Sequence, residues 1–135
     1  MTNHFHLVLR ANEGNLSPGM QILNRGHAQF VNKRYGRGGH LFRNRFGAEA
    51  IETDEHLREA CRYVVLNPVR AGIVADPVDW RWSSYRATVG LERAPAFLAV
   101  RELLGLFGSE VAAARDAYRR FVADGMAAAR TAITA

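Results

Sequence analysis

Two histidines separated by a single residue, His4 and His6, form the clearest candidate metal-binding pattern near the start of the chain. They lie in residues 3–10, an alternating stretch rich in β-formers that predicts a strand. Alternate side chains of a strand project from one face, so the two imidazoles would lie about 7 Å apart along the backbone. Such a pair can converge on one metal ion, although most His-x-His pairs are incidental.

Tyr63 and Asn67 form a second candidate pair, four residues apart on a predicted helix. This spacing places both side chains on one helical face. A tyrosine hydroxyl becomes a nucleophile when a nearby cation polarises its target, and an asparagine carbonyl oxygen suits a hard cation. Taken alone, the pair is more often a packing tyrosine and an asparagine in the last turn of a helix.

Positive charge is concentrated in one region. The chain has 18 basic and 13 acidic residues, a formal net charge of +5. The stretch from Arg25 to Arg45 contains no acidic residue, and its basic residues are Arg25, Lys33, Arg34, Arg37, Arg43 and Arg45. Such a patch is the electrostatic footprint of a phosphate-backbone binder, while a solvated surface explains the charge equally well. His40 lies in the same stretch and could contact a phosphate or a base.

Aromatic residues alternate with arginines in the segment WRWSSYR, residues 80–86. Its members could form a stacking platform for single-stranded bases, or its tryptophans could fix a turn against the core. The sequence has no Gly-rich phosphate loop, Cys-x-x-Cys pair or nucleophilic serine elbow, which argues against an ATP-driven mechanism.

The elements that must position these residues follow from local signals. Ser17 and Pro18 predict the start of a helix that ends near Tyr35, and Thr53 or Asp54 caps a second helix that Pro68 ends. A short strand is expected around residues 48–52. Two further helices are expected at residues 95–107 and 109–123, and the last ten residues resemble a fraying tail.

Length and composition predict one soluble domain without a membrane-spanning segment or a signal peptide. The single cysteine, Cys61, excludes an internal disulfide and fits a reducing compartment, so we expect a cytoplasmic protein. Cys61 itself is expected to be a small buried residue on the second helix.

Four motifs in this order resemble the REP-associated tyrosine transposases, a branch of the single-tyrosine HUH transposases: MTNHFHLVL, GHLFRNRF, YVVLNPVRAGIV and WRWSSYR. The resemblance extends from residue 1 to about residue 124. It implies that His4, His6 and Asn67 bind Mg²⁺ or Mn²⁺ and that Tyr63 is the nucleophile. It also implies an α+β, ferredoxin-like fold, although the family's strand-helix-strand before the histidine strand is absent here. We therefore expect an N-terminally truncated sheet.

The resemblance divides the chain into an incomplete catalytic domain (1–91), a helical extension (92–125) and a tail (126–135). It implies metal-dependent cleavage and joining of single-stranded or hairpin DNA, such as REP-like palindromes, through a 5′-phosphotyrosine. A monomer or a homodimer is expected. The DNA-binding residues would be Arg25, Lys33, Arg34, Arg37, His40, Arg43, Arg45, Arg70 and Arg81.

Two alternatives remain open at this stage. The chain could be an inactive DNA-binding remnant of such a transposase, because His4 and His6 need a rigid platform. It could also be a small protein in which His4, His6 and Cys61 hold a structural Zn²⁺, in which case it would fold only with zinc and form no DNA adduct.

Overall fold

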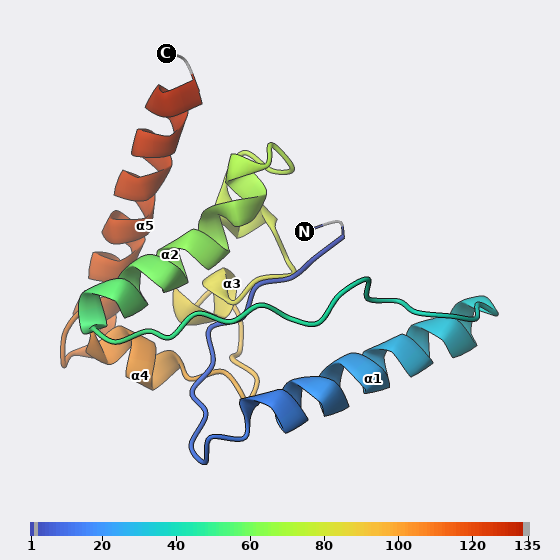
Figure 1. Cartoon of the computed structure of the whole chain (residues 1–135). Helices are drawn as coiled ribbons and strands as arrows, with labels where there is room; N and C mark the ends of the chain where they lie inside the picture. The colour runs from blue at the N-terminus through green and yellow to red at the C-terminus, as the bar shows by residue number, and fades with distance from the viewer. Residues whose placement is uncertain (2, 134–135) are drawn as a thin grey trace. The chain divides into compact units, whose positions relative to one another are not determined.

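The computed structural model describes the backbone of residues 1 and 3–133 and side chains as far as residue 127. The chain forms two compact units. Unit 1 contains residues 1–8 and the chain from Ile51 onward, and unit 2 contains Leu9–Ala50. Every regular element in the described range is helical (Figure 1).

The expected α+β, ferredoxin-like fold is wrong for this structure, because the described residues contain no strand. Residues 3–10 and 48–52 are extended or irregular and form no ladder. A strand is stable only when its backbone N–H and C=O groups bond to a neighbouring strand, and neither segment has one. Phe5 and Leu7, two of the apolar side chains that predicted the first strand, are exposed.

Unit 2 contains α1 (Leu16–Tyr35), which confirms the expected first helix. The helix begins after Asn15, whose side chain makes no capping bond, so the predicted cap at Ser17 and first helical residue Pro18 are each two residues late. Gly36 ends α1 in the left-handed region, with φ of 60°. A side chain there would be strained, which explains why the glycine stops the helix.

Unit 1 begins its helical part with α2 (Asp54–Arg70), where the Thr53 hydroxyl accepts a hydrogen bond from the His56 backbone N–H at 3.1 Å. This confirms the predicted cap. The predicted end at Pro68 is wrong, because α2 continues through Pro68 to Arg70. Pro68 has no backbone N–H, so α2 loses one hydrogen bond at this position. Pro68 lies in the last turn of the helix, and its carbonyl accepts a hydrogen bond from Ile73 N–H at 2.9 Å.

The remaining elements of unit 1 are short, with one exception. They are η1 (Pro77–Asp79), α3 (Tyr85–Thr88), α4 (Val100–Gly105) and α5 (Val111–Ile133). The helix expected at 95–107 is therefore shorter, and the one expected at 109–123 is longer. It extends through most of the expected tail, where alanines favour helix, while residues 134–135 lie outside the described range.

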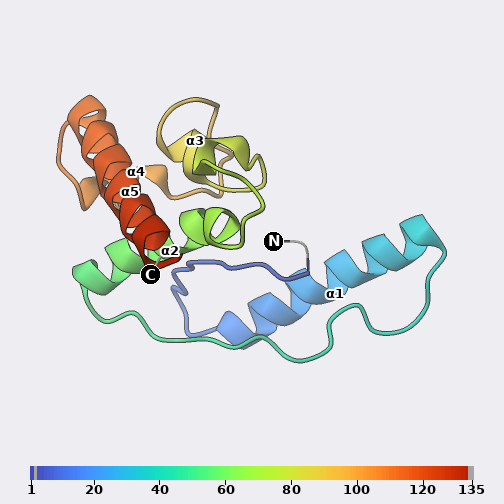
Figure 2. The ribbon, with the colours of Figure 1, turned by 90° about the horizontal axis from the view of Figure 1, so that it is seen from above.

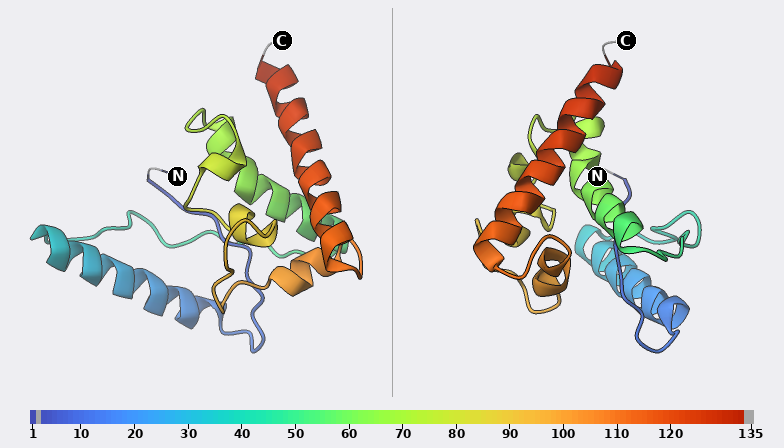
Figure 3. Two further views of the ribbon diagram at one scale, coloured as in Figure 1. Left: turned by 180° about the vertical axis from the view of Figure 1, so that it is seen from behind. Right: turned by 90° about the vertical axis from the view of Figure 1, so that its left-hand side faces the viewer.

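Helices α2 and α5 lie side by side in unit 1 (Figures 2 and 3), and most of the core residues of this unit come from these two helices. Helix α5 contributes a stripe of buried residues at four-residue spacing, Ala114, Tyr118 and Val122. These residues pack with Val65 and Leu66 of α2 and with Val89 and Leu104. Burial of this apolar area is the main term that stabilises unit 1.

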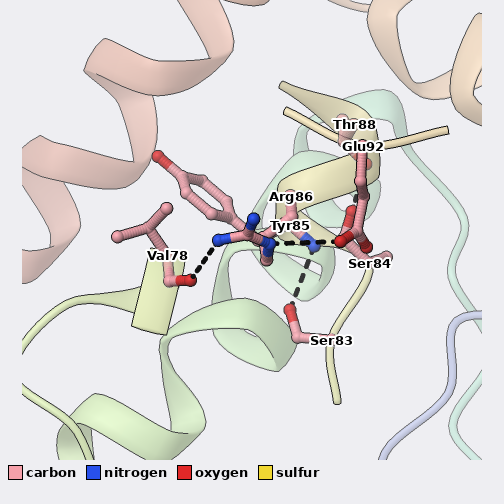
Figure 4. A network of polar contacts seen from close by, with 7 residues as sticks. All are labelled: Val78, Ser83, Ser84, Tyr85, Arg86, Thr88 and Glu92. Carbon is pink, nitrogen blue, oxygen red and sulfur yellow. Dashed lines mark hydrogen bonds and ion pairs between the residues drawn. The ribbon is translucent and has the colours of Figure 1, made fainter. Parts of the chain in front are cut away.

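A polar network fixes the segment around α3 (Figure 4). Arg86 donates from Nη1 to the Val78 carbonyl at 3.2 Å and from Nε to Glu92 at 3.1 Å. The Ser83 hydroxyl accepts from Tyr85 N–H at 3.0 Å. Three members of the WRWSSYR motif, Ser83, Tyr85 and Arg86, thus help to hold the fold.

Among the described residues, none of the helices combines the length and apolar character that crossing a membrane requires.

Candidate functional site

Tyr63 and the two N-terminal histidines lie together in unit 1, although 57 positions separate His6 from Tyr63 in the sequence. The ring centroids of His6 and Tyr63 are 5.4 Å apart in an edge-to-face arrangement. His4 and His6 are 5.1 Å apart, again edge to face. Helix α2 presents Tyr63, and the irregular segment 3–8 presents the histidines. Tyr63 remains 45% exposed, so a large substrate can reach its hydroxyl.

Asn3 orients His4. The Asn3 Oδ1 atom lies 2.7 Å from His4 Nδ1. An amide oxygen only accepts, so this contact fits the tautomer with the proton on Nδ1, in which Nε2 carries the lone pair that a cation needs. Burial lowers the pKa of His6, and the nearby His4 and N-terminal amine lower the pKa further. Both effects favour the neutral imidazole, which is the form that binds metals.

Asn67 lies one turn after Tyr63 and is only 9% exposed. Its Nδ2 atom is buried without a hydrogen-bond partner in the described part of the chain. A buried amide with an unmet bond is costly and calls for a partner outside the protein atoms. Rotation of the amide exchanges its nitrogen and oxygen, so the same position can present Oδ1 to a cation.

The donor set of His4, His6 and Asn67 therefore suits a divalent cation in chemical type. The zinc alternative gains no support, because no three His, Cys, Asp or Glu side chains of the described residues gather as a metal site. Cys61 is half-buried, and burial raises the pKa of its thiol. A zinc ligand must be a thiolate, so this environment opposes the role.

Arg70 completes the surroundings of Tyr63. It lies two helical turns later on the same face of α2, and its guanidinium carbon is 5.4 Å from the centroid of the Tyr63 ring. Sequence reasoning placed Arg70 among the DNA-binding residues but missed its contact with the nucleophile candidate. The spacing of seven residues between them is the signal that could have revealed it.

All nine residues predicted to bind DNA are exposed. Seven belong to unit 2, where Arg25, Lys33 and Arg34 lie on α1 and Arg37, His40, Arg43 and Arg45 follow it. The other two, Arg70 and Arg81, belong to unit 1.

The WRWSSYR segment divides into two parts. Tyr85 and Arg86 support the fold, whereas Trp82 is 73% exposed and lies under the Arg81 guanidinium, 4.6 Å from it. The expectation of a stacking platform thus narrows to Arg81 and Trp82.

Comparison with family models, curated proteins and solved structures finds no match for this chain.

Proposed function

We propose that this protein cuts and joins single-stranded DNA by transesterification, with Tyr63 as the nucleophile. The observation that carries the proposal is that His6 and Arg70 both contact the ring of the exposed Tyr63, while His4 lies against His6. Imidazoles bind cations and a guanidinium binds phosphates, so these neighbours suit a tyrosine that attacks a phosphodiester. The chemistry matches what the resemblance to REP-associated tyrosine transposases implies.

In this reaction the Tyr63 oxygen forms a bond to phosphorus while the bond from phosphorus to the 3′ oxygen breaks. The proton of the phenol ends on the released 3′-hydroxyl, and the 5′ end stays attached to Tyr63 as a phosphotyrosine. Attack by another 3′-hydroxyl reverses the step and joins strands, so no nucleotide cofactor or oxidant is needed. His4, His6 and Asn67 would hold Mg²⁺ or Mn²⁺, which supplies charge stabilisation at the phosphate.

The exposed cations of both units support a nucleic-acid substrate. Their charge and the net +5 favour a polyanion, and arginine pairs bidentately with phosphate oxygens. We infer that the substrate is a hairpin with single-stranded flanks, such as a REP-like palindrome, bound by a monomer or a homodimer. A half-buried single cysteine fits the cytoplasm as the place of action.

A covalent-adduct assay tests the proposal. The purified chain is incubated with labelled hairpin DNA carrying single-stranded flanks, with Mn²⁺ or with EDTA, and separated on a denaturing gel. We expect a slower-migrating protein–DNA band that forms with Mn²⁺ and is lost in Tyr63→Phe. His4→Ala should reduce the band by at least about tenfold, because loss of a ligand or its support costs affinity on that scale.

Tyr35→Phe is the matched control, since Tyr35 is also an exposed tyrosine, on α1. A band lost in Tyr35→Phe but kept in Tyr63→Phe would contradict the assignment of the nucleophile. Binding of Mn²⁺ is checked separately from activity, by paramagnetic broadening of the imidazole NMR signals. Loss of broadening in His4→Ala is expected, and equal broadening of all five histidines would contradict the metal site.

A second candidate function is DNA binding without cleavage. It is favoured by the extended, unpaired segment that carries His4 and His6, since a catalytic pair is usually held by a rigid element. This function predicts retention of labelled DNA on a native gel with no covalent band under any condition. Binding should weaken steeply with salt, because each phosphate contact releases a counterion.

A further inference from the structure

Arg70 differs from the other arginines of α2 in having no hydrogen-bond or ion-pair partner among the described residues. Arg58 donates to the Leu106 carbonyl at 3.3 Å, and Arg62 pairs with Glu59 at 2.6 Å. Among the described residues, no carboxylate or carbonyl accepts a hydrogen bond from Arg70, and its side chain is exposed. Its one contact is with the Tyr63 ring. The donors of its guanidinium are therefore available to a ligand on the surface beside Tyr63.

We infer that Arg70 binds a non-bridging oxygen of the phosphodiester that Tyr63 attacks. This inference rests on the proposed function and adds to it a specific anion-binding group. The guanidinium carbon lies 5.4 Å from the centre of the ring that carries the attacking oxygen, and a flexible arginine side chain beside that ring can turn its donors toward a phosphate bound there. Arg70 acts through hydrogen bonds and charge, and the proposed step moves no proton through it.

The role follows from the charge that develops during the reaction. When the phenol oxygen and the 3′ oxygen are both partly bonded to phosphorus, negative charge is spread over the non-bridging oxygens. A positioned cation stabilises this arrangement more than the ground state, which raises the rate. The planar fork of arginine can bond two oxygens at once, so lysine is an incomplete replacement.

The test replaces one non-bridging oxygen at the cleaved linkage by a methyl group, which removes the negative charge. Wild type, Arg70→Ala and Arg70→Lys are compared on phosphodiester and methylphosphonate hairpins in the adduct assay. Arg101→Ala is the matched control, because Arg101 is an exposed arginine on α4. Thermal unfolding followed by circular dichroism checks that each variant is folded.

On the phosphodiester, we expect Arg70→Ala to slow adduct formation by about 10²–10³-fold, as loss of a positioned transition-state donor does. On the methylphosphonate, wild type and Arg70→Ala should differ by less than about threefold, because the charge that Arg70 stabilises is gone. Arg70→Lys should lie between them on the phosphodiester. Arg101→Ala should match wild type on both substrates.

Two results would overturn the inference while leaving the proposed function intact. One is an equal loss for Arg70→Ala on both substrates, which shows a structural role. The other is an adduct that depends on Tyr63 but not on Arg70. If neither wild type nor any variant forms an adduct, that result contradicts the proposed function instead.

In that last case, equilibrium binding still decides the role of Arg70. Methylphosphonates are placed one at a time along the single-stranded flank, and affinity is measured by fluorescence anisotropy with the Tyr63→Phe chain. With the Tyr63→Phe chain, we expect one position at which the neutral linkage weakens DNA binding several-fold. With the chain that carries both Tyr63→Phe and Arg70→Ala, the neutral linkage at that position should not weaken binding. If Arg70→Ala and the methylphosphonate weaken binding independently of each other at every position, the inference is overturned.

Discussion

Two arginines of α2 lie over aromatic rings, and they differ in the hydrogen bonds that they make. Arg62 lies 4.2 Å from the Phe121 ring centre, donates to the Phe121 carbonyl at 3.3 Å and pairs with both oxygens of Glu59. Arg70 lies over Tyr63 with no other partner among the described residues. One guanidinium is used up in joining α2 to α5, while the other is available to a ligand.

The comparison extends to the faces that carry these arginines. The face with Arg62 also carries Val65 and Leu66, which are almost fully buried in the core. The face with Arg70 carries the exposed Tyr63 and is met by the histidine segment. Substitutions on the first face should therefore change stability, and those on the second should change DNA chemistry.

Leu66→Ala should give the largest change in stability, because Leu66 is 0% exposed. Truncation of a buried leucine leaves a cavity and costs about 2–5 kcal/mol. Urea unfolding followed by circular dichroism measures the loss. The comparison predicts that Tyr63→Phe, on the open face, leaves the unfolding midpoint unchanged. A large shift for Tyr63→Phe would show that the open face also supports the core.

Arg62→Ala should have an intermediate effect of about 1 kcal/mol, because the side chain contributes packing and charge-assisted hydrogen bonds in a partly exposed setting. Arg70→Ala should cost less than about 0.5 kcal/mol, as surface substitutions usually do. Thermal unfolding of the pair distinguishes them. If both variants lose the same amount of stability, Arg62 and Arg70 cannot be divided into a structural and a ligand-binding arginine.

Tyr118→Phe should change the stability least at neutral pH, and its effect should become measurable only at alkaline pH. Burial raises the pKa of Tyr118, and its hydroxyl has no hydrogen-bond partner in the described structure. The unfolded chain loses the phenol proton near pH 10 while the folded chain keeps it, so stability falls as pH rises above 10. Urea midpoints at pH 7 and 11 should fall less in Tyr118→Phe. An equal fall in both proteins would contradict this origin.

Helical features were predictable where the signal is local. The Thr53 cap and the glycine that ends α1 depend on neighbouring residues alone, and both are observed. The end of α2 was mispredicted, because a proline in a last turn forfeits only one hydrogen bond. The strand at residues 3–10 could not be decided locally, since a strand depends on a partner elsewhere.

The candidate site was predictable in part. The spacing of Tyr63, Asn67 and Arg70 alone places the three residues on one face of a helix. The meeting of His6 with Tyr63 is a long-range contact, and only the resemblance pointed to it from the sequence. The bond between Asn3 and His4 has no signature in the sequence.

The division of the chain has a consequence for how the site assembles. Residues 1–8 and the helices from Ile51 onward form one unit, so Leu9–Ala50 is a loop whose two ends that unit must hold together. Closing a loop of about forty residues carries an entropic cost that grows by about 0.6 kcal/mol with each doubling of length. Replacing unit 2 by a linker a quarter as long should therefore favour the docking of His6 on Tyr63 by about 1 kcal/mol. The length of Leu9–Ala50 thus works against the docking of His6 on Tyr63 within unit 1.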